Sequence, residues 1–232
     1  MIIGINGKIG AGKDTVGAII QKLLLTNKNQ TSQIKKFAGK LKQIASLLTG
    51  FPVEMFESSD FKKSYLGEQW AKTPVAPLSQ ATLFDTVDFN NLMTYREFLQ
   101  KLGTEAMRDG LHENTWVNAL FADYNATGYN YTGCENKVIQ GEWEYPNWII
   151  TDMRFPNEME AVVERKGITI RVVRSFNHKM GSKETGTLDL TPLHPSETAL
   201  DDAEFNYTII NDGTIENLVE KVREILIKEN II

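Results

Sequence analysis

Residues 4–15 of the chain, GINGKIGAGKDT, carry the strongest indication of its fold. Gly7, Gly12 and Lys13 fit the pattern G-x-x-x-x-G-K of a loop that binds phosphate groups. In that pattern a Ser or Thr follows the lysine, whereas here Asp14 follows it and Thr15 comes one position later. The stretch is therefore either a phosphate loop that is altered at the position whose hydroxyl normally contacts the metal ion, or a glycine turn that matches the pattern by chance.

The residues around the motif favour the phosphate loop. Residues 1–5, MIIGI, form an apolar, β-branched run that is typical of a buried parallel strand. After Lys13, apolar residues recur at helical spacing: Val16, Ile19, Ile20, Leu23 and Leu24. Glycines between a strand and a helix let backbone N–H groups turn toward phosphate oxygens, and the helix adds the positive end of its dipole. An ordinary glycine turn does not explain the lysine and the threonine together.

The loop residues have different expected roles. Lys13 supplies a mobile positive charge for the β- and γ-phosphates, and the Thr15 hydroxyl meets a phosphate or hydrated magnesium. Bound triphosphate repels the Asp14 carboxylate unless a cation lies between them, so Asp14 helps to hold magnesium, faces the second substrate, or only favours the helix N-terminus. The predicted nucleotide-binding residues of the loop are Gly7, Gly10, Ala11, Gly12, Lys13, Asp14 and Thr15.

Composition limits the class of protein. A chain of 232 residues can hold one large domain or a core domain with insertions, and 41% apolar residues support a globular core. The formal charge of −5 argues against wrapping nucleic acid. The single cysteine excludes an internal disulfide and a Cys-based zinc site. Because no basic, apolar leader and no long apolar run occurs, we expect a cytoplasmic protein that does not cross a membrane.

Apolar runs alternate with helical patterns along the chain. Strands are predicted at residues 1–5, 33–38, 148–152, 168–174 and 205–210, and helices after Lys13, at 39–49, 94–110, 114–124 and 156–167, and from 214. This alternation indicates an α/β fold with a parallel sheet covered by helices on both faces. Because ligands bind at the carboxyl ends of such strands, the Gly7 loop, Asp152, Arg174 and Asn211 should meet at one edge.

Other segments fit this alternation less clearly. Residues 51–91 have weak periodicity and are predicted to be an irregular insertion with short helices, and residues 125–146 a surface loop or hairpin. Thr94 and Glu97 have the spacing of a capping box at a helix start. The polar residues 175–202 suit either a lid that closes over phosphates or a charged surface loop.

Two charged residues follow the predicted strand 148–152. Asp152 stands where an acid can hold magnesium beside phosphates, or where it caps the helix that begins near Pro156. Arg154 has a guanidinium that can grip a phosphate with two hydrogen bonds, or that makes a surface salt bridge.

Three further residues have both a functional and a structural interpretation. Arg108 clamps an acceptor phosphate, or is a cation that favours a helix C-terminus. Trp116 stacks on a base or belongs to the core. Asn211, in the turn after the last strand, edges the nucleotide base or caps a helix. His112 and His194 are too far apart in sequence to suggest a metal pair.

Five segments carry further information, and they occur along the chain in this order: GKIGAGKDT, LQKLGTEAMRDGLHENTWV, IITDMRFPNEME, HPSETALDD and YTIINDGTIENL. Together they resemble the deoxynucleoside monophosphate kinases of bacteriophages and related bacterial sequences. DMRFPNE and HPSE are the more specific pieces, and residues 51–91 and 125–146 carry little of the resemblance. The ending G-K-x-T also occurs in nucleotide kinases such as adenylate kinase.

The resemblance implies a P-loop kinase fold with a central five-stranded parallel sheet, forming a single domain over residues 1–232. Residues 51–125 would be an acceptor-binding insertion and residues 175–202 a lid. The lid lacks the arginines that nucleotide kinase lids often carry, so its lysines and Arg174 would have to serve. His194 and Glu197 fall in the lid-side motif without an assigned role.

The implied reaction is phosphoryl transfer from ATP, with Mg²⁺ as cofactor, to a deoxynucleoside monophosphate. Four residues would be catalytic: Lys13, Asp152, Arg154 and Arg108. The acceptor would contact Arg108, Trp116, Asp152 and Arg154. ATP would contact the loop together with Arg174 and Asn211. Magnesium would be held by Thr15, Asp14 and Asp152.

Rival functions remain open. Dephospho-CoA kinase and phosphomevalonate kinase share this general layout and differ in the acceptor. A nucleotide-dependent switch protein would lack an acceptor pocket, but no guanine-reading N/T-K-x-D motif follows a strand, which weighs against a GTPase. An inactive P-loop protein is a third alternative. We expect small-molecule nucleotide partners, no membrane and no stable nucleic-acid partner; the accepted base and the oligomeric state, a homodimer included, stay open.

Overall fold

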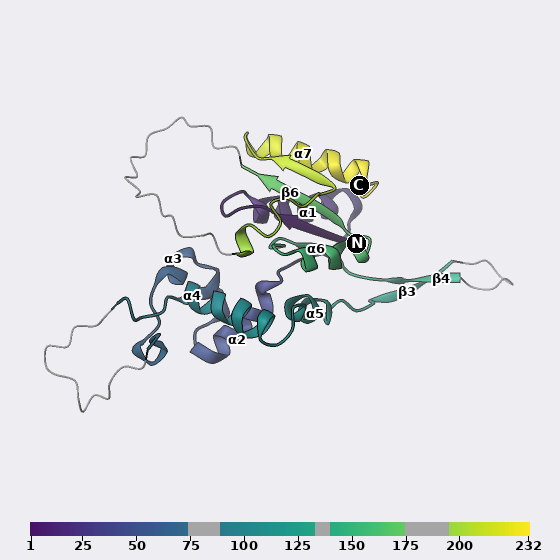
Figure 1. Ribbon diagram of the computed structural model, residues 1–232. Helices are drawn as coiled ribbons and strands as arrows, with labels where there is room; N and C mark the ends of the chain where they lie inside the picture. The colour runs from purple at the N-terminus through teal and green to yellow at the C-terminus, as the bar shows by residue number, and fades with distance from the viewer. Residues whose placement is uncertain (74–88, 133–139, 175–194) are drawn as a thin grey trace, which may run out of the picture. The chain divides into compact units, whose positions relative to one another are not determined.

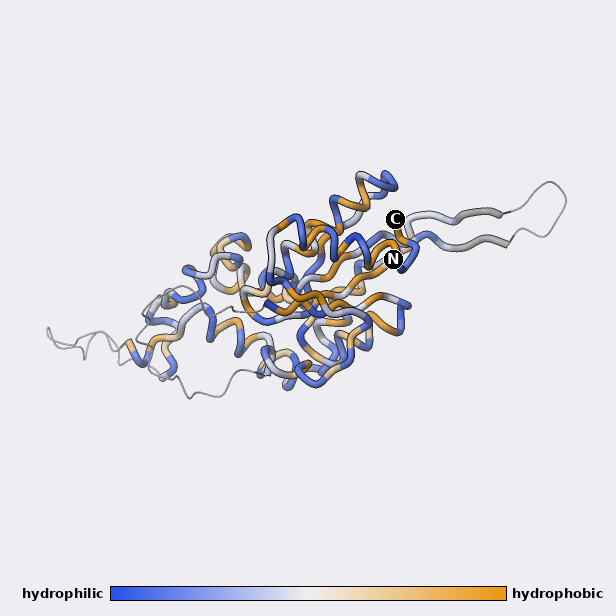
Figure 2. The backbone as a smooth tube through the Cα atoms, turned by 90° about the horizontal axis from the view of Figure 1, so that it is seen from above, coloured by the Kyte–Doolittle hydropathy of each residue, from blue (hydrophilic) through white to orange (hydrophobic). Residues whose placement is uncertain are grey.

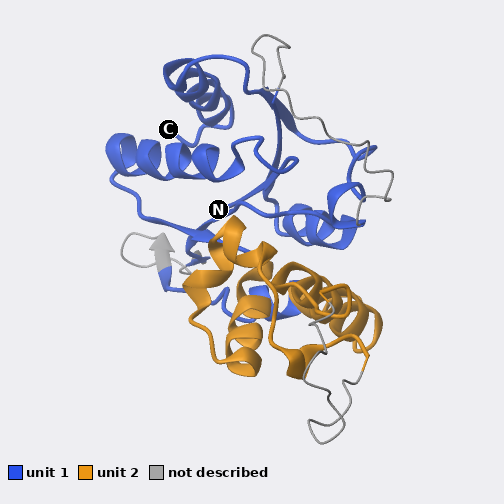
Figure 3. Ribbon diagram, turned by 90° about the vertical axis from the view of Figure 1, so that its left-hand side faces the viewer, with its two compact units in different colours: residues 1–37, 117–232 blue, residues 38–116 orange. Residues whose placement is uncertain are grey.

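The structure, a computed structural model, describes residues 1–73, 89–132, 140–174 and 195–232. They form two compact units, shown in Figure 3: unit 1 comprises Met1–Phe37 and Val117–Ile232, and unit 2 comprises Ala38–Trp116. Unit 2 overlaps the predicted insertion 51–125, but it begins earlier because the helix after the second strand packs within it. The single domain over residues 1–232 stays a prediction.

Unit 1 is built on the expected five-stranded parallel sheet, which confirms the α/β class. Its strand order is β2-β5-β1-β6-β7, so β1 is central, with β5 on one side and β6 on the other. Successive crossovers therefore lead to opposite sides of β1, and such a switch point opens a crevice at the carboxyl end of the strand. The strands are β1 (Ile2–Asn6), β2 (Ser32–Lys35), β5 (Asn147–Ile150), β6 (Ile168–Val173) and β7 (Tyr207–Ile210).

Helices cover both faces of this sheet (Figure 1). Side chains alternate along β1: Ile3 and Ile5 pack with α1 and α7, whereas Ile2 packs in a second cluster with residues of α5 and α6. Figure 2 shows the strands as a hydrophobic centre, which explains their β-branched sequences. The helices are α1 (Lys13–Lys28), α5 (Thr115–Phe121), α6 (Pro156–Glu164) and α7 (Ile215–Lys228).

A hairpin interrupts the connection between α5 and β5. Strands β3 (Gly128–Thr132) and β4 (Gln140–Glu144) pair antiparallel, which confirms the hairpin alternative for residues 125–146. The rings of Tyr129 and Trp143 pack edge to face across it, with their centroids 4.8 Å apart.

Unit 2 is helical and has its own core, formed by Ala45, Phe56, Leu66, Tyr95 and Phe98. The predicted capping box is confirmed, since the Thr94 hydroxyl accepts from Glu97 N and the Glu97 carboxylate accepts from Thr94 N at 2.7 Å. The predicted helix 94–110 changes from α- to π-helical winding partway along. Its elements are α2 (Ala38–Thr49), η1 (Val53–Glu57), α3 (Ser59–Lys63), η2 (Glu68–Trp70), α4 (Tyr95–Gln100) and the π-helix η4 (Lys101–Asp109).

Some predictions fall outside the described residues. Residues 175–194, which form most of the predicted lid and include His194, lie there, as does Cys134. The described part of the predicted lid starts at residue 195 with the short helix η5 (Pro195–Glu197). Among the described residues, no helix is both long enough and apolar enough to traverse a bilayer.

Candidate active site

The glycine loop leaves β1 at the carboxyl edge of the sheet and leads into α1. A Cβ atom on Gly7 would lie 2.4 Å from the Val172 carbonyl oxygen, and one on Gly12 would lie 2.6 Å from Asn211 Nδ2. Gly12 also has a φ of 100°, which side chains rarely tolerate. Gly7 is therefore needed for the backbone to approach β6 this closely, and Gly12 is needed for its backbone conformation. The loop ends at the N-terminus of a long helix, where N–H groups face an incoming anion.

Two side chains from neighbouring strands hold the loop. Arg174, just after β6, donates from Nη1 to the Gly10 carbonyl oxygen at 3.2 Å. Asn211, just after β7, donates from Nδ2 to the Ala11 carbonyl oxygen at 2.9 Å. The structure thus brings both residues to the edge predicted for them, where they fix the shape of the loop.

Lys13 points back over the loop, with Nζ donating to the Lys8 carbonyl oxygen at 2.9 Å. Burial, the largest cause, and the Arg154 guanidinium lower the pKa of Lys13. Carboxylates oppose this lowering of the pKa: those of Glu197, Asp14 and Asp152. Lys13 therefore lies within electrostatic range of another cation and of several acids that border the loop.

Asp14 is tied to the sheet at the other end of the motif. Its Oδ1 accepts from Thr151 Oγ1 at 2.8 Å and lies 3.4 Å from Lys36 Nζ. Partial burial alone would raise the pKa of Asp14, but the bond from Thr151 and the charge of Lys36 outweigh burial and lower it. The carboxylate is thus held in its charged form beside the exposed Thr15. Sequence reasoning missed Thr151, although a polar residue at the end of the apolar run WII is a usable signal.

Asp152 and Arg154 follow β5 at the same edge. Asp152 Oδ1 accepts from Phe37 N at 2.7 Å, which joins it to the residues after β2. The residue that caps α6 is Phe155, so Asp152 is not the helix cap that was its alternative role. Arg154 bonds through Nη1 to the Glu197 carboxylate, forming a salt bridge.

Glu158 sets the position of Arg154 and was missed from the sequence. It is 3% exposed, and its Oε2 accepts from Arg154 N at 2.7 Å and from Phe155 N at 3.2 Å. The start of α6 is therefore folded back onto a buried carboxylate, which fixes the backbone from which Arg154 projects. A glutamate three residues after a helix cap is the recognisable signal.

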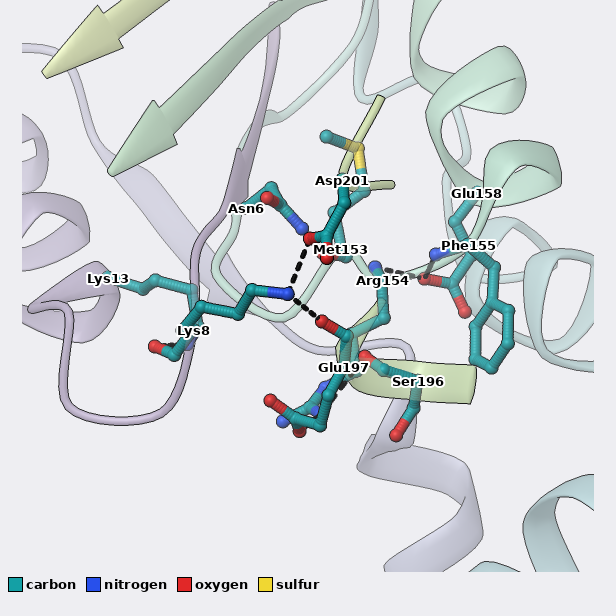
Figure 4. Close-up of polar contacts among 10 residues, drawn as sticks. All are labelled: Asn6, Lys8, Lys13, Met153, Arg154, Phe155, Glu158, Ser196, Glu197 and Asp201. Carbon is teal, nitrogen blue, oxygen red and sulfur yellow. Dashed lines mark hydrogen bonds and ion pairs between the residues drawn. The ribbon is translucent and has the colours of Figure 1, made fainter. Parts of the chain in front are cut away.

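A segment distant in sequence closes one side of the loop. We call residues 195–202 the acidic segment; Figure 4 shows Glu197 and Asp201 of this segment beside Lys8 and Arg154, with Lys13 on the other side of Lys8. Lys8 Nζ bonds to the Asp201 carboxylate and to the Glu197 carbonyl oxygen. Arg171 also donates to two carbonyl oxygens of the segment, those of Leu200 and Asp201.

A cavity of about 230 Å³ lies between the loop, the end of β6 and the acidic segment, all within unit 1. Basic side chains outnumber acidic ones in its wall. The charged residues that line it are Lys8, Arg154, Arg171, Arg174, Glu197 and Asp201. The cavity therefore suits an anionic ligand next to the phosphate loop.

Arg108 and Trp116 lie in unit 2. Arg108 is 9% exposed and donates from Nη1 to the Glu113 carbonyl oxygen at 3.4 Å. Trp116 is 5% exposed, and its Nε1 donates to the Gly103 carbonyl oxygen at 2.8 Å. The tryptophan thus occupies the core position that was its alternative role, and base stacking by it stays a prediction.

The oxygen donors at the loop suit magnesium. Across residues 1–73, 89–132, 140–174 and 195–232, no cluster of three or more His, Cys, Asp or Glu side chains could hold a metal ion alone. Magnesium usually binds one or two carboxylates together with substrate phosphates and water, which requires no such cluster. Asp14, Thr15 and Asp152 supply donors of that kind at one edge of the sheet.

Comparison with known proteins gives a family match. Residues 42–222 match the family model described as deoxynucleotide monophosphate kinase. The deoxynucleotide monophosphate kinase of Escherichia phage RB69 is 28% identical over 139 residues, which are 60% of this chain and 47% of that protein. The match thus spans about half the length of the curated relative. Shikimate kinase from Aquifex aeolicus vf5 aligns over 100% of this chain and 99% of its own, with 12% identity and a TM-score of 0.39.

Proposed function

The chain belongs to the deoxynucleotide monophosphate kinase family, and we propose that it transfers the γ-phosphoryl group of ATP to a deoxynucleoside monophosphate. The observation that carries this proposal is the glycine loop at the carboxyl edge of β1, with Lys13 and Arg154 at its border. The products are ADP and a deoxynucleoside diphosphate.

The residues of the loop would act by position and charge. An oxygen of the acceptor phosphate forms a bond to the γ-phosphorus while the bond from that phosphorus to the ADP oxygen breaks in line. Such a transfer needs little covalent chemistry from the protein. Lys13 and Arg154 would neutralise charge on the phosphoryl group, and the N–H groups of the loop would hold the ATP phosphates. Arg174 and Asn211 would keep the loop in shape, since both bond to its carbonyl oxygens.

Magnesium, when bound, would neutralise charge on the β- and γ-phosphates. Asp14, Thr15 and Asp152 would hold it. Two of these side chains have fixed orientations, because Thr151 bonds to Asp14 and Phe37 N bonds to Asp152.

We assign the acceptor to unit 2. Arg108 is a buried cation within this unit. A guanidinium held in an interior position is suited to clamp a phosphate, because its planar fork loses little freedom on binding.

A coupled assay of ADP release tests the proposal. The donor is ATP with Mg²⁺, and the acceptors are dAMP, dGMP, dCMP and dTMP, their ribose forms, dephospho-CoA and phosphomevalonate. We expect ADP release that depends on a deoxynucleotide. Release only with dephospho-CoA or phosphomevalonate would move the chain to those kinases. ATP binding without acceptor-stimulated turnover would favour a switch protein or an inactive one.

The variant Lys13→Ala tests the role of the loop lysine in the proposed reaction. It should lower turnover strongly and leave the fold intact, because Lys13 contacts only a carbonyl oxygen of its own loop by hydrogen bond in the described structure. Removing one charge at the transferred group costs a few kcal/mol, about 10²–10³ in rate. Lys22→Ala removes an exposed lysine from the same helix and should keep full activity. A wild-type rate in Lys13→Ala would refute the catalytic role assigned to Lys13.

A further inference from the structure

The acidic segment contacts cations that the proposed reaction would use. The Glu197 carboxylate bonds to Arg154, and the Asp201 carboxylate bonds to Lys8 of the glycine loop. These contacts join residues far apart in the chain, 43 positions for the first pair and 193 for the second. The segment is also anchored by Arg171, which donates to two of its carbonyl oxygens.

Glu197 lies where phosphate charge is expected to gather. Figure 4 shows its side chain beside Arg154 and near Lys8, with Lys13 across the loop. Its negative charge is felt at Lys13, where it opposes the lowering of the lysine's pKa. A phosphate group bound by Arg154 and Lys13 would therefore meet a carboxylate that already interacts with both cations.

The two ion pairs differ in solvent exposure. The side chains of Arg154 and Glu197 are 35% and 17% exposed, whereas those of Lys8 and Asp201 are 54% and 50% exposed. Water and salt screen the exposed pair more strongly. Glu197 should consequently have the larger effect on an anion at this site.

We propose that Glu197, and more weakly Asp201, compete with nucleotide phosphates for the cations at the glycine loop, and thereby set how tightly the site holds ATP and ADP. This inference rests on the proposed phosphate site and adds to it two residues that weaken binding. A phosphate that bonds to Arg154 must share that guanidinium with Glu197 or displace it. Like charges in the same site repel, so removing the carboxylate favours the phosphate.

The test is the affinity for ADP and for inorganic tripolyphosphate, measured by titration calorimetry without any acceptor. Glu197→Gln should bind both probes about fivefold more tightly than wild type, which corresponds to ~1 kcal/mol. Asp201→Asn should bind about twofold more tightly, because its pair is more exposed. Glu197→Asp keeps the charge and should stay near wild type. Asp202→Asn removes the same charge from the neighbouring exposed residue and should also stay near wild type.

Salt provides a second readout, because the gain of Glu197→Gln should shrink as ionic strength rises. Unchanged or weaker binding in Glu197→Gln would overturn the inference, since a purely structural carboxylate lowers affinity when removed. An equal gain in Asp202→Asn would also overturn it, because net charge alone would then explain the effect. The calorimetry requires no turnover, so its outcome stands apart from the acceptor assay that tests the kinase function.

Discussion

Thr151→Val should weaken the hold of the sheet on Asp14. The substitution replaces a hydroxyl with a methyl group of similar size at a position that is 1% exposed. It removes the 2.8 Å bond to Asp14 Oδ1 and little else. Hydrogen bonds to charged groups contribute about 1.5–3 kcal/mol. Because the Asp14 side chain is 72% exposed, water partly replaces the lost bond, and we expect a loss of about 1 kcal/mol in the free energy of unfolding.

The loss should depend on pH. The folded protein lowers the pKa of Asp14 below its usual 3.8, so the carboxylate stabilises the fold above that pH and less as pH falls through the lowered pKa. The difference between Thr151→Val and wild type should therefore be full at pH 7 and should shrink below 3.8. Urea unfolding followed by circular dichroism at several pH values measures it.

A double-mutant cycle isolates the pair. Asp14→Asn, Thr151→Val and the double variant should give a coupling free energy of about 1 kcal/mol at pH 7. Thr151→Ser keeps the hydroxyl and should keep the coupling, although it loses the methyl group that packs against α1 beside Gly17. A coupling below about 0.3 kcal/mol would refute the view that Thr151 holds Asp14.

Gly12→Ala should lower the free energy of unfolding by about 2 kcal/mol, since the φ of 100° is strained for alanine and its Cβ would meet Asn211 Nδ2 at 2.6 Å. Chemical denaturation checks this, and stability equal to wild type would contradict the backbone strain expected at position 12. Arg108→Ala should raise the KM of the nucleotide acceptor about tenfold or more and change the KM of ATP less than about twofold. Steady-state kinetics with each substrate varied in turn measure the two KM values separately. An equal rise in both KM values would contradict a role of Arg108 in acceptor binding.

The centre of the sheet could be predicted because β1 and β5 are formed by continuous apolar runs. Residues 2–5 and 148–151 are buried on both faces, so their composition alone indicates a central parallel strand. The common edge of the Gly7 loop, Arg174 and Asn211 followed from the rule that parallel strands end together, and the bonds to Gly10 and Ala11 confirm their closeness. Their roles toward a nucleotide stay predictions.

The pairings inside the site could not be predicted. Lys8 and Asp201 are 193 positions apart, and which acid meets which base depends on loop conformation and on the register between strands. Thr151 and Glu158 each look like ordinary members of a strand and a helix. Only the backbone positions of Asp14 and Arg154, known once the fold is known, reveal what their side chains hold.

The boundaries of unit 2 could not be predicted from the sequence either. The predicted helix 39–49 directly follows β2, which is where a helix that connects two strands of the sheet would also lie. Its periodicity shows an apolar face but does not show which core that face joins. In the structure Ala45 of this helix packs with Phe56 and Tyr95 of unit 2.

Unit 2 is one continuous insertion in the chain, and the residues on either side of it pack in the same part of unit 1. Phe37, just before it, and Val117, just after it, belong to one buried cluster of unit 1. All five strands of the sheet lie outside unit 2. The unit is therefore a cassette in the genetic sense: recombination could exchange it between relatives at two neighbouring junctions. Under the proposed assignment of the acceptor to unit 2, such an exchange would change the accepted substrate and leave the proposed ATP-binding residues of unit 1 unchanged.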